Sequence, residues 1–118
     1  MSKDSILKTK SFDFAIRIIN LYKYLKKRYS EYEFSSQILR SGTSVGALIR
    51  EAEHAQSRKD FLHKLSIGLK EINETLYWLE LLFATDYISK KMFESMYSDG
   101  EGILKMLISS TKTIKNRG

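Results

Sequence analysis

The residues that could carry out chemistry gather in one stretch, from Glu51 to His63. Glu51 and His54 have the Glu-x-x-His spacing with which some helical bundles bind a pair of metal ions, and Asp60 and His63 repeat a similar spacing. The two pairs flank a single expected turn between helices, and the first expected helix contains no glutamate to complete a site. We therefore expect no metal and no other cofactor.

Arg58 and His63 form a second candidate site. Their separation resembles the short Arg–His spacing of certain helical-bundle ribonucleases, in which the histidine acts as general acid or base and the arginine holds the phosphate. The spacing is also common, and it fits two surface positions at the start of a helix. The sequence contains no Ser–His–Asp set, glycine-rich phosphate loop or Walker-type motif. It therefore favours a protein that is not an enzyme, with a ribonuclease as an alternative.

Basic residues are concentrated near the N-terminus. The net charge of the 118 residues is +6, and residues 1–30 carry eight Lys and Arg against two Asp. A basic surface attracts nucleic acid, and it also keeps a protein soluble. The residues that we expect to contact a nucleic acid, if one is bound, are Arg17, Lys23, Lys26, Lys27 and Arg28.

The composition restricts the class of protein. The chain has no cysteine, which excludes disulfides and thiolate metal sites, and no proline, which favours long helices. No window approaches 18 consecutive apolar residues, and the N-terminal MSKDSILKTK lacks the apolar segment of a signal peptide. We expect a cytoplasmic protein that does not associate with a membrane.

Apolar residues recur at intervals of three and four along most of the chain, a pattern typical of amphipathic helices. The pattern predicts a single domain, residues 1–118, with helices at about 12–28, 32–55, 58–84 and 89–114. Short connections make consecutive helices antiparallel. The predicted fold is therefore all-α, an antiparallel up-down-up-down four-helix bundle.

The helix ends have their own signals. Ser11 is the expected N-cap of the first helix, and Ser57 with Asp60 forms an expected capping box for the third. The apolar arc of the first helix is wider than one neighbouring helix would cover, which suggests contact with two partners or with another subunit.

Small residues interrupt the second expected helix. Two glycines and three Ser or Thr in a helix interior cost roughly 3–4 kcal/mol relative to alanine. The apolar spacing nevertheless stays in phase from Ile38 through Val45 to Ala52, so we predict a continuous helix, with a kink at 41–44 as the alternative. Small side chains would allow close approach of another helix, which we expect in the same subunit. The residues predicted to pack in this way are Ser41, Gly42, Ser44, Gly46 and Ala47.

The stretches QILRSGTSVGALIREA and SRKDFLHKLSIGLKEINETLYWLELL resemble the 23S rRNA-intervening-sequence protein family. The resemblance covers nearly the whole chain from Phe12 onward, and one position departs from it, because Leu48 stands where the family usually has asparagine. Its most specific positions are Gln37, Arg40, Ser44, Glu51, Ser57, Phe61, Lys64, Ser66, Lys70, Glu71, Glu74 and Trp78.

This resemblance implies a four-helix bundle that assembles into ring-shaped homopentamers and has no enzymatic activity. Genes of the family occur inside insertions in bacterial 23S rRNA genes and also stand alone. A related bundle, the accessory variability protein of diversity-generating retroelements, is a basic pentamer that binds nucleic acid and its reverse transcriptase. We therefore expect a homo-oligomer that binds RNA or DNA. The alternatives are a protein-interaction scaffold without a nucleic-acid ligand and the Arg58/His63 ribonuclease.

Overall fold

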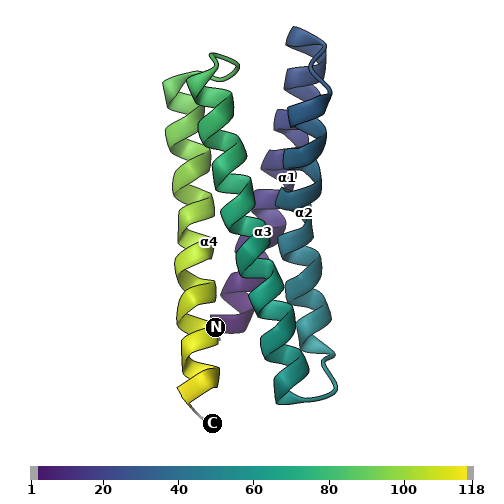
Figure 1. Ribbon diagram of the computed structural model, residues 1–118, viewed down its shortest axis with the longest axis vertical. Coiled ribbons are helices and arrows are strands. Elements are labelled where there is room, and N and C mark those ends of the chain that lie inside the picture. The colour runs from purple at the N-terminus through teal and green to yellow at the C-terminus, as the bar shows by residue number, and fades with distance from the viewer. Residues whose placement is uncertain (1–2, 117–118) are drawn as a thin grey trace.

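Four long α-helices make up most of residues 3–116, the part of the chain that the computed structural model describes. They are α1 (Lys3–Tyr29), α2 (Glu33–Glu53), α3 (Arg58–Ala84) and α4 (Lys90–Asn116). Each helix packs against its neighbours in the chain, and α1 also packs against α4, so that a bundle 47 Å long is closed. The α1–α2 and α3–α4 connections lie at one end of the bundle, and the α2–α3 connection lies at the other (Figure 1). The predicted all-α four-helix bundle is confirmed.

The core consists of the apolar stripes of the four helices. In α1 the buried positions recur at three and four, as in Phe14, Ile18, Leu21 and Leu25, and each of the other helices contributes a similar stripe. Among the described residues, no helix is long and apolar enough to cross a membrane.

The first helix begins at Lys3, so the prediction that it starts near residue 12 with Ser11 as its N-cap was wrong. Ser11 lies inside the helix, and its hydroxyl donates a hydrogen bond to the Lys8 carbonyl oxygen at 3.1 Å. The reason lies in Leu7, which is only 1% exposed and belongs to the core. Leu7 precedes Phe14 by seven residues, so the apolar stripe continues for two further turns toward the N-terminus.

The start of the third helix follows its predicted capping signal. The Ser57 hydroxyl oxygen accepts a hydrogen bond from the Asp60 backbone N–H at 3.0 Å. The Asp60 carboxylate accepts in turn from the backbone N–H of Gln56, one residue before the position that the usual capping box would use.

The three-residue connection between α1 and α2 is held by hydrogen bonds at both of its ends. Ser30 has a left-handed backbone conformation (φ 53°), and its N–H donates to the Lys26 carbonyl oxygen at 3.0 Å. The Glu31 carboxylate accepts from the N–H groups of Phe34 (2.9 Å) and Ser35 (2.8 Å), and so caps the second helix from a position outside it. These bonds fix the connection relative to both helices.

The second helix runs without a break through its small residues, and its two glycines face α1 of the same chain. A β-carbon at Gly42 would lie 2.7 Å from Cγ1 of Ile18, and one at Gly46 would lie 3.5 Å from the Ser11 carbonyl oxygen. Ser41 is buried on the other side, where the Thr75 hydroxyl donates to its Oγ at 2.8 Å.

The two other small residues of this set do not lie at such a contact. The half-buried Ser44 donates its hydroxyl to the Arg40 carbonyl oxygen of the preceding turn. Ala47 is exposed, so its small side chain does not serve close packing within this chain.

Candidate nucleic-acid interface

Four of the predicted basic residues lie together on the last two turns of α1, at the end of the bundle that carries the α1–α2 and α3–α4 connections (Figure 1). Lys23 and Lys27 are four residues apart and exposed, so they share one outward face of the helix. Lys26 is half-buried and Arg28 is exposed. No carboxylate of residues 5–116, the range whose side chains the structure describes, forms an ion pair with any of the four.

The fifth predicted residue, Arg17, is not brought into this group. Its guanidinium forms an ion pair with Asp99 of α4, and its Nη2 donates to the Ser95 hydroxyl at 3.0 Å. Arg17 therefore helps to hold α1 against α4, and its charge is already matched.

Tyrosines, which were not among the predicted site residues, surround the four basic residues. On the α2 side, the Lys26 ammonium lies 4.9 Å from the centre of the Tyr22 ring and 5.6 Å from that of Tyr32. Both distances are those of cation–π contacts. We call these three residues the Tyr22–Lys26–Tyr32 group; it joins α1 to the residue that precedes α2.

A second aromatic group, Tyr24–Tyr29–Tyr87, lies at the same end of the bundle. The Tyr29 ring meets the rings of Tyr24 (6.2 Å, 80°) and Tyr87 (5.1 Å, 86°) edge to face, and the Arg28 guanidinium stands 5.2 Å from the Tyr29 ring centre. Partial burial, together with the neighbouring Tyr29, raises the pKa of the Tyr24 phenol above its ordinary value. The sequence YKYLKKRYSEY, with four tyrosines among four basic residues, was the available signal for this site.

Charged residues also line the seam between α2 and α3. Arg40 forms ion pairs with Glu71 (2.8 Å) and Glu74, and the Trp78 indole N–H donates to Glu74 at 3.0 Å. The hydrogen bond from Trp78, and then those from Arg40, lower the pKa of Glu74, while the bond to Glu74 raises the pKa of Arg40. Glu51 and Lys64 pair further along the seam at 3.1 Å. Several of the most specific positions of the resemblance therefore tie α2 to α3.

Leu48, the residue that departs from the family pattern, lies on the same seam. A β-carbon at Gly68 would be 3.9 Å from Cβ of Leu48, so the leucine covers the α3 backbone at that point. It also lines a shallow groove of about 260 Å³ beside Ser44 and Glu71.

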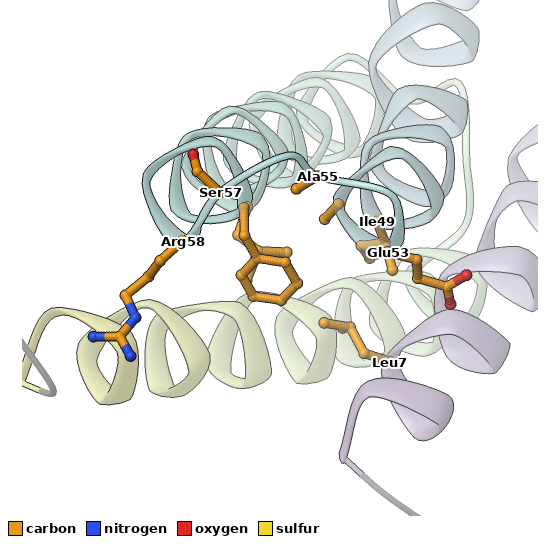
Figure 2. Close-up of a pocket in the computed structure, with 9 residues that line it drawn as sticks. Leu7, Ile49, Glu53, Ala55, Ser57 and Arg58 are labelled. Atoms are coloured by element: carbon orange, nitrogen blue, oxygen red, sulfur yellow. The ribbon is translucent and has the colours of Figure 1, made fainter.

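A pocket of about 430 Å³ opens at the other end of the bundle, where the ribonuclease alternative would require its site. Figure 2 shows Arg58 extending toward α4 and Glu53 turning toward α1, where it pairs with Lys8 at 3.2 Å. The residues between them are mostly apolar: Leu7, Ile49, Ala52, Ala55, Phe61 and Leu65.

His63 does not line this pocket, and it points away from Arg58. Five residues of helix separate the two side chains by about 140° around the axis, and His63 is exposed. Arg58 and His63 therefore do not converge on one phosphate. Among the side chains of residues 5–116, no three His, Asp or Glu come together as a metal site.

The fold and this interface define a class: a small, basic four-helix bundle with cations and tyrosines exposed at one end. The model of the 23S rRNA-intervening sequence protein family matches residues 3–109, and the chain belongs to this family.

A solved structure agrees with this assignment. The crystal structure, at 1.70 Å resolution, of a protein of unknown function from the S23 ribosomal protein family of Bacteroides thetaiotaomicron VPI-5482 is 58% identical in sequence. It superposes with a TM-score of 0.92, covering 94% of this chain and 99% of that one. No curated protein matches the chain.

Proposed function

We propose that this protein is a non-enzymatic oligomer that binds RNA or DNA through the basic end of α1. The observation that carries the proposal is the group of exposed cations without carboxylate partners among the described residues: Lys23, Lys27 and Arg28. Other cations of the bundle, such as Arg17 and Arg40, are neutralised by ion pairs. Unpaired exposed cations attract phosphate without a competing internal partner.

The positive net charge of the whole chain also supports a nucleic-acid ligand. Each copy adds a net charge of +6, so assembly would increase the positive field that a nucleic acid meets. The names of the family and of its solved member refer to 23S rRNA and to ribosomal proteins, so RNA is the first ligand to test and the cytoplasm the expected compartment.

An exposed apolar face on α1 supports the oligomer. Phe12, Ile16 and Ile19 are 52%, 45% and 38% exposed, and their spacing of four and three places them on one face of the helix. Contiguous exposed apolar residues are typical of protein interfaces. A second copy of the chain would cover this face, and the resemblance to the family favours a pentamer.

The proposal is tested by fluorescence anisotropy with labelled RNA and DNA oligonucleotides of about 12 nucleotides, the scale of single-strand binding sites. We expect binding by the native chain and a clear loss of affinity in the double variant Lys23→Gln/Lys27→Gln. The matched control is Lys70→Gln/Lys112→Gln, which removes the same charge from exposed positions of α3 and α4. Equal losses in the two variants, or no binding by the native chain, would contradict the proposal.

The same apolar face also supports a second candidate, a scaffold whose partner is a different protein. In that case the exposed apolar face of α1 would bind the partner, and the positive net charge would serve solubility. A protein that co-purifies with the chain in equal amounts before and after nuclease treatment, and that an Ile16→Glu variant no longer binds, would favour the scaffold.

A further inference from the structure

Tyr22 and Tyr24, one from each aromatic group, lie on opposite sides of the exposed Lys23 of α1. Tyr22 and Tyr24 are the residues immediately before and after Lys23, so they project about 100° to either side of it around the helix. Lys26 contacts the rings of both Tyr22 and Tyr32. The Tyr29 ring contacts the rings of both Tyr24 and Tyr87. A strand that crosses the bundle over Lys23 and Lys27 would therefore have aromatic rings on both sides.

The rings are exposed and held in position. Tyr32 is 56% exposed and Tyr29 is 39% exposed. The capped α1–α2 connection holds Tyr32, and the edge-to-face contacts with Tyr24 and Tyr87 hold Tyr29. A ring that is already fixed loses little conformational entropy when a ligand stacks on it.

The cations and the rings suit different parts of one ligand. Ammonium and guanidinium groups bind phosphates, and an aromatic face binds the flat surface of a nucleobase. In a duplex the bases are paired and stacked on one another, so only phosphates are available to this end of the bundle. In a single strand the bases are free to leave the stack and lie against tyrosine.

We propose that this end of the bundle binds single-stranded nucleic acid in preference to duplex, with one unpaired base stacked on Tyr32 and another on Tyr29. Lys23 and Lys27 bind phosphates of the same strand. The inference rests on the proposed function and specifies its ligand, because a purely electrostatic surface would accept either form.

The test compares anisotropy titrations with a single-stranded RNA of about 12 nucleotides, the DNA of the same sequence, and the matching RNA duplex. Tyr32→Ala should weaken single-strand binding by about 5- to 150-fold, the loss of one stacked base, and leave duplex binding unchanged. Tyr32→Phe, which retains the ring, should bind as the native chain does. Tyr77→Ala is the matched control, since Tyr77 is 54% exposed on α3.

The outcomes separate this inference from the proposed function. Equal affinity for single strand and duplex, with Tyr32→Ala unchanged and Lys23→Gln/Lys27→Gln weakened, would overturn stacking and leave the basic surface as the binding site. No binding to any of the three probes would overturn both. The inference is supported if the native chain prefers the single strand, Tyr32→Phe retains this preference and Tyr32→Ala loses it. Comparison of the single-stranded RNA and DNA probes then identifies the preferred sugar.

Discussion

Gly42 of α2 faces Ile18 of α1 so closely that a β-carbon at position 42 would lie 2.7 Å from Ile18 Cγ1 and 2.9 Å from its Cγ2. Ile18 is fully buried, so it cannot move aside without disturbing the core. We expect Gly42→Ala to lower the free energy of unfolding by about 1–3 kcal/mol, as overpacking does, although alanine is the better helix former. Urea unfolding followed by circular dichroism measures this change.

Gly102 is the matched control for that substitution. It also lies in a helix interior, but a β-carbon there would meet nothing within 4 Å. Gly102→Ala should therefore raise the free energy of unfolding by about 0.5–1 kcal/mol. If both variants were stabilised alike, close approach between α1 and α2 would not be the reason for a glycine at position 42.

Glu74 should contribute to an acid-sensitive part of the stability. Its hydrogen bond from Trp78, together with the contact with Arg40, lowers its pKa in the folded state. That stabilisation is present above the unfolded carboxyl pKa of about 4.3 and is lost as pH falls through the lower folded pKa. Glu74→Gln should therefore lose less stability on acidification than the native chain.

Trp78 provides the measurement for this pH effect. It is the single tryptophan of the chain and its indole N–H donates to Glu74, so its fluorescence reports on the surroundings of that carboxylate. Unfolding curves at neutral pH and near pH 3.5, about one unit below the unfolded carboxyl pKa, should differ more in the native chain than in Glu74→Gln. An equal acid loss in both would show that Glu74 has no part in it.

The apolar face of α1 should control assembly. Ile16→Glu places a charge on that face, and burial of an unpaired charge in an interface is costly, so we expect the oligomer to dissociate to the 13.7 kDa chain. Ile108→Glu is the control, since Ile108 is similarly exposed (39%) but lies on α4. Light scattering on a sizing column measures the mass. A native chain that is already monomeric, or equal dissociation in both variants, would contradict this role.

Periodicity in the sequence predicted the bundle because burial of an apolar stripe determines which segments form helices. The regular spacing of apolar residues from Ile38 to Ala52 predicted that α2 is continuous across its glycines, and Ser57 predicted the start of α3. The prediction that Ser11 caps the first helix was wrong because a capping preference is local, whereas the packing of Leu7 in the core is a tertiary effect.

The candidate site was only partly predictable for the same reason. The cluster of basic residues on α1 is visible in the sequence, and so are the tyrosines between them. The pairing of Arg17 with Asp99 and the contact of Tyr29 with Tyr87 are not, because both join residues far apart in the chain. Only the packing of α4 and of the α3–α4 connection against α1 shows which cations remain available.

The salt dependence of RNA binding reports how many phosphates the basic end of α1 contacts. Each phosphate contact to a single strand contributes about −0.7 to the slope of log K against log salt. If Lys23, Lys27 and Arg28 each bind a phosphate, the slope should be about −2 or steeper, and Lys23→Gln/Lys27→Gln should reduce its magnitude by about 1.4. Arg17→Gln should leave the slope unchanged, because that guanidinium is paired with Asp99. A slope near zero, or one that the double variant does not alter, would show that these cations do not bind RNA phosphates.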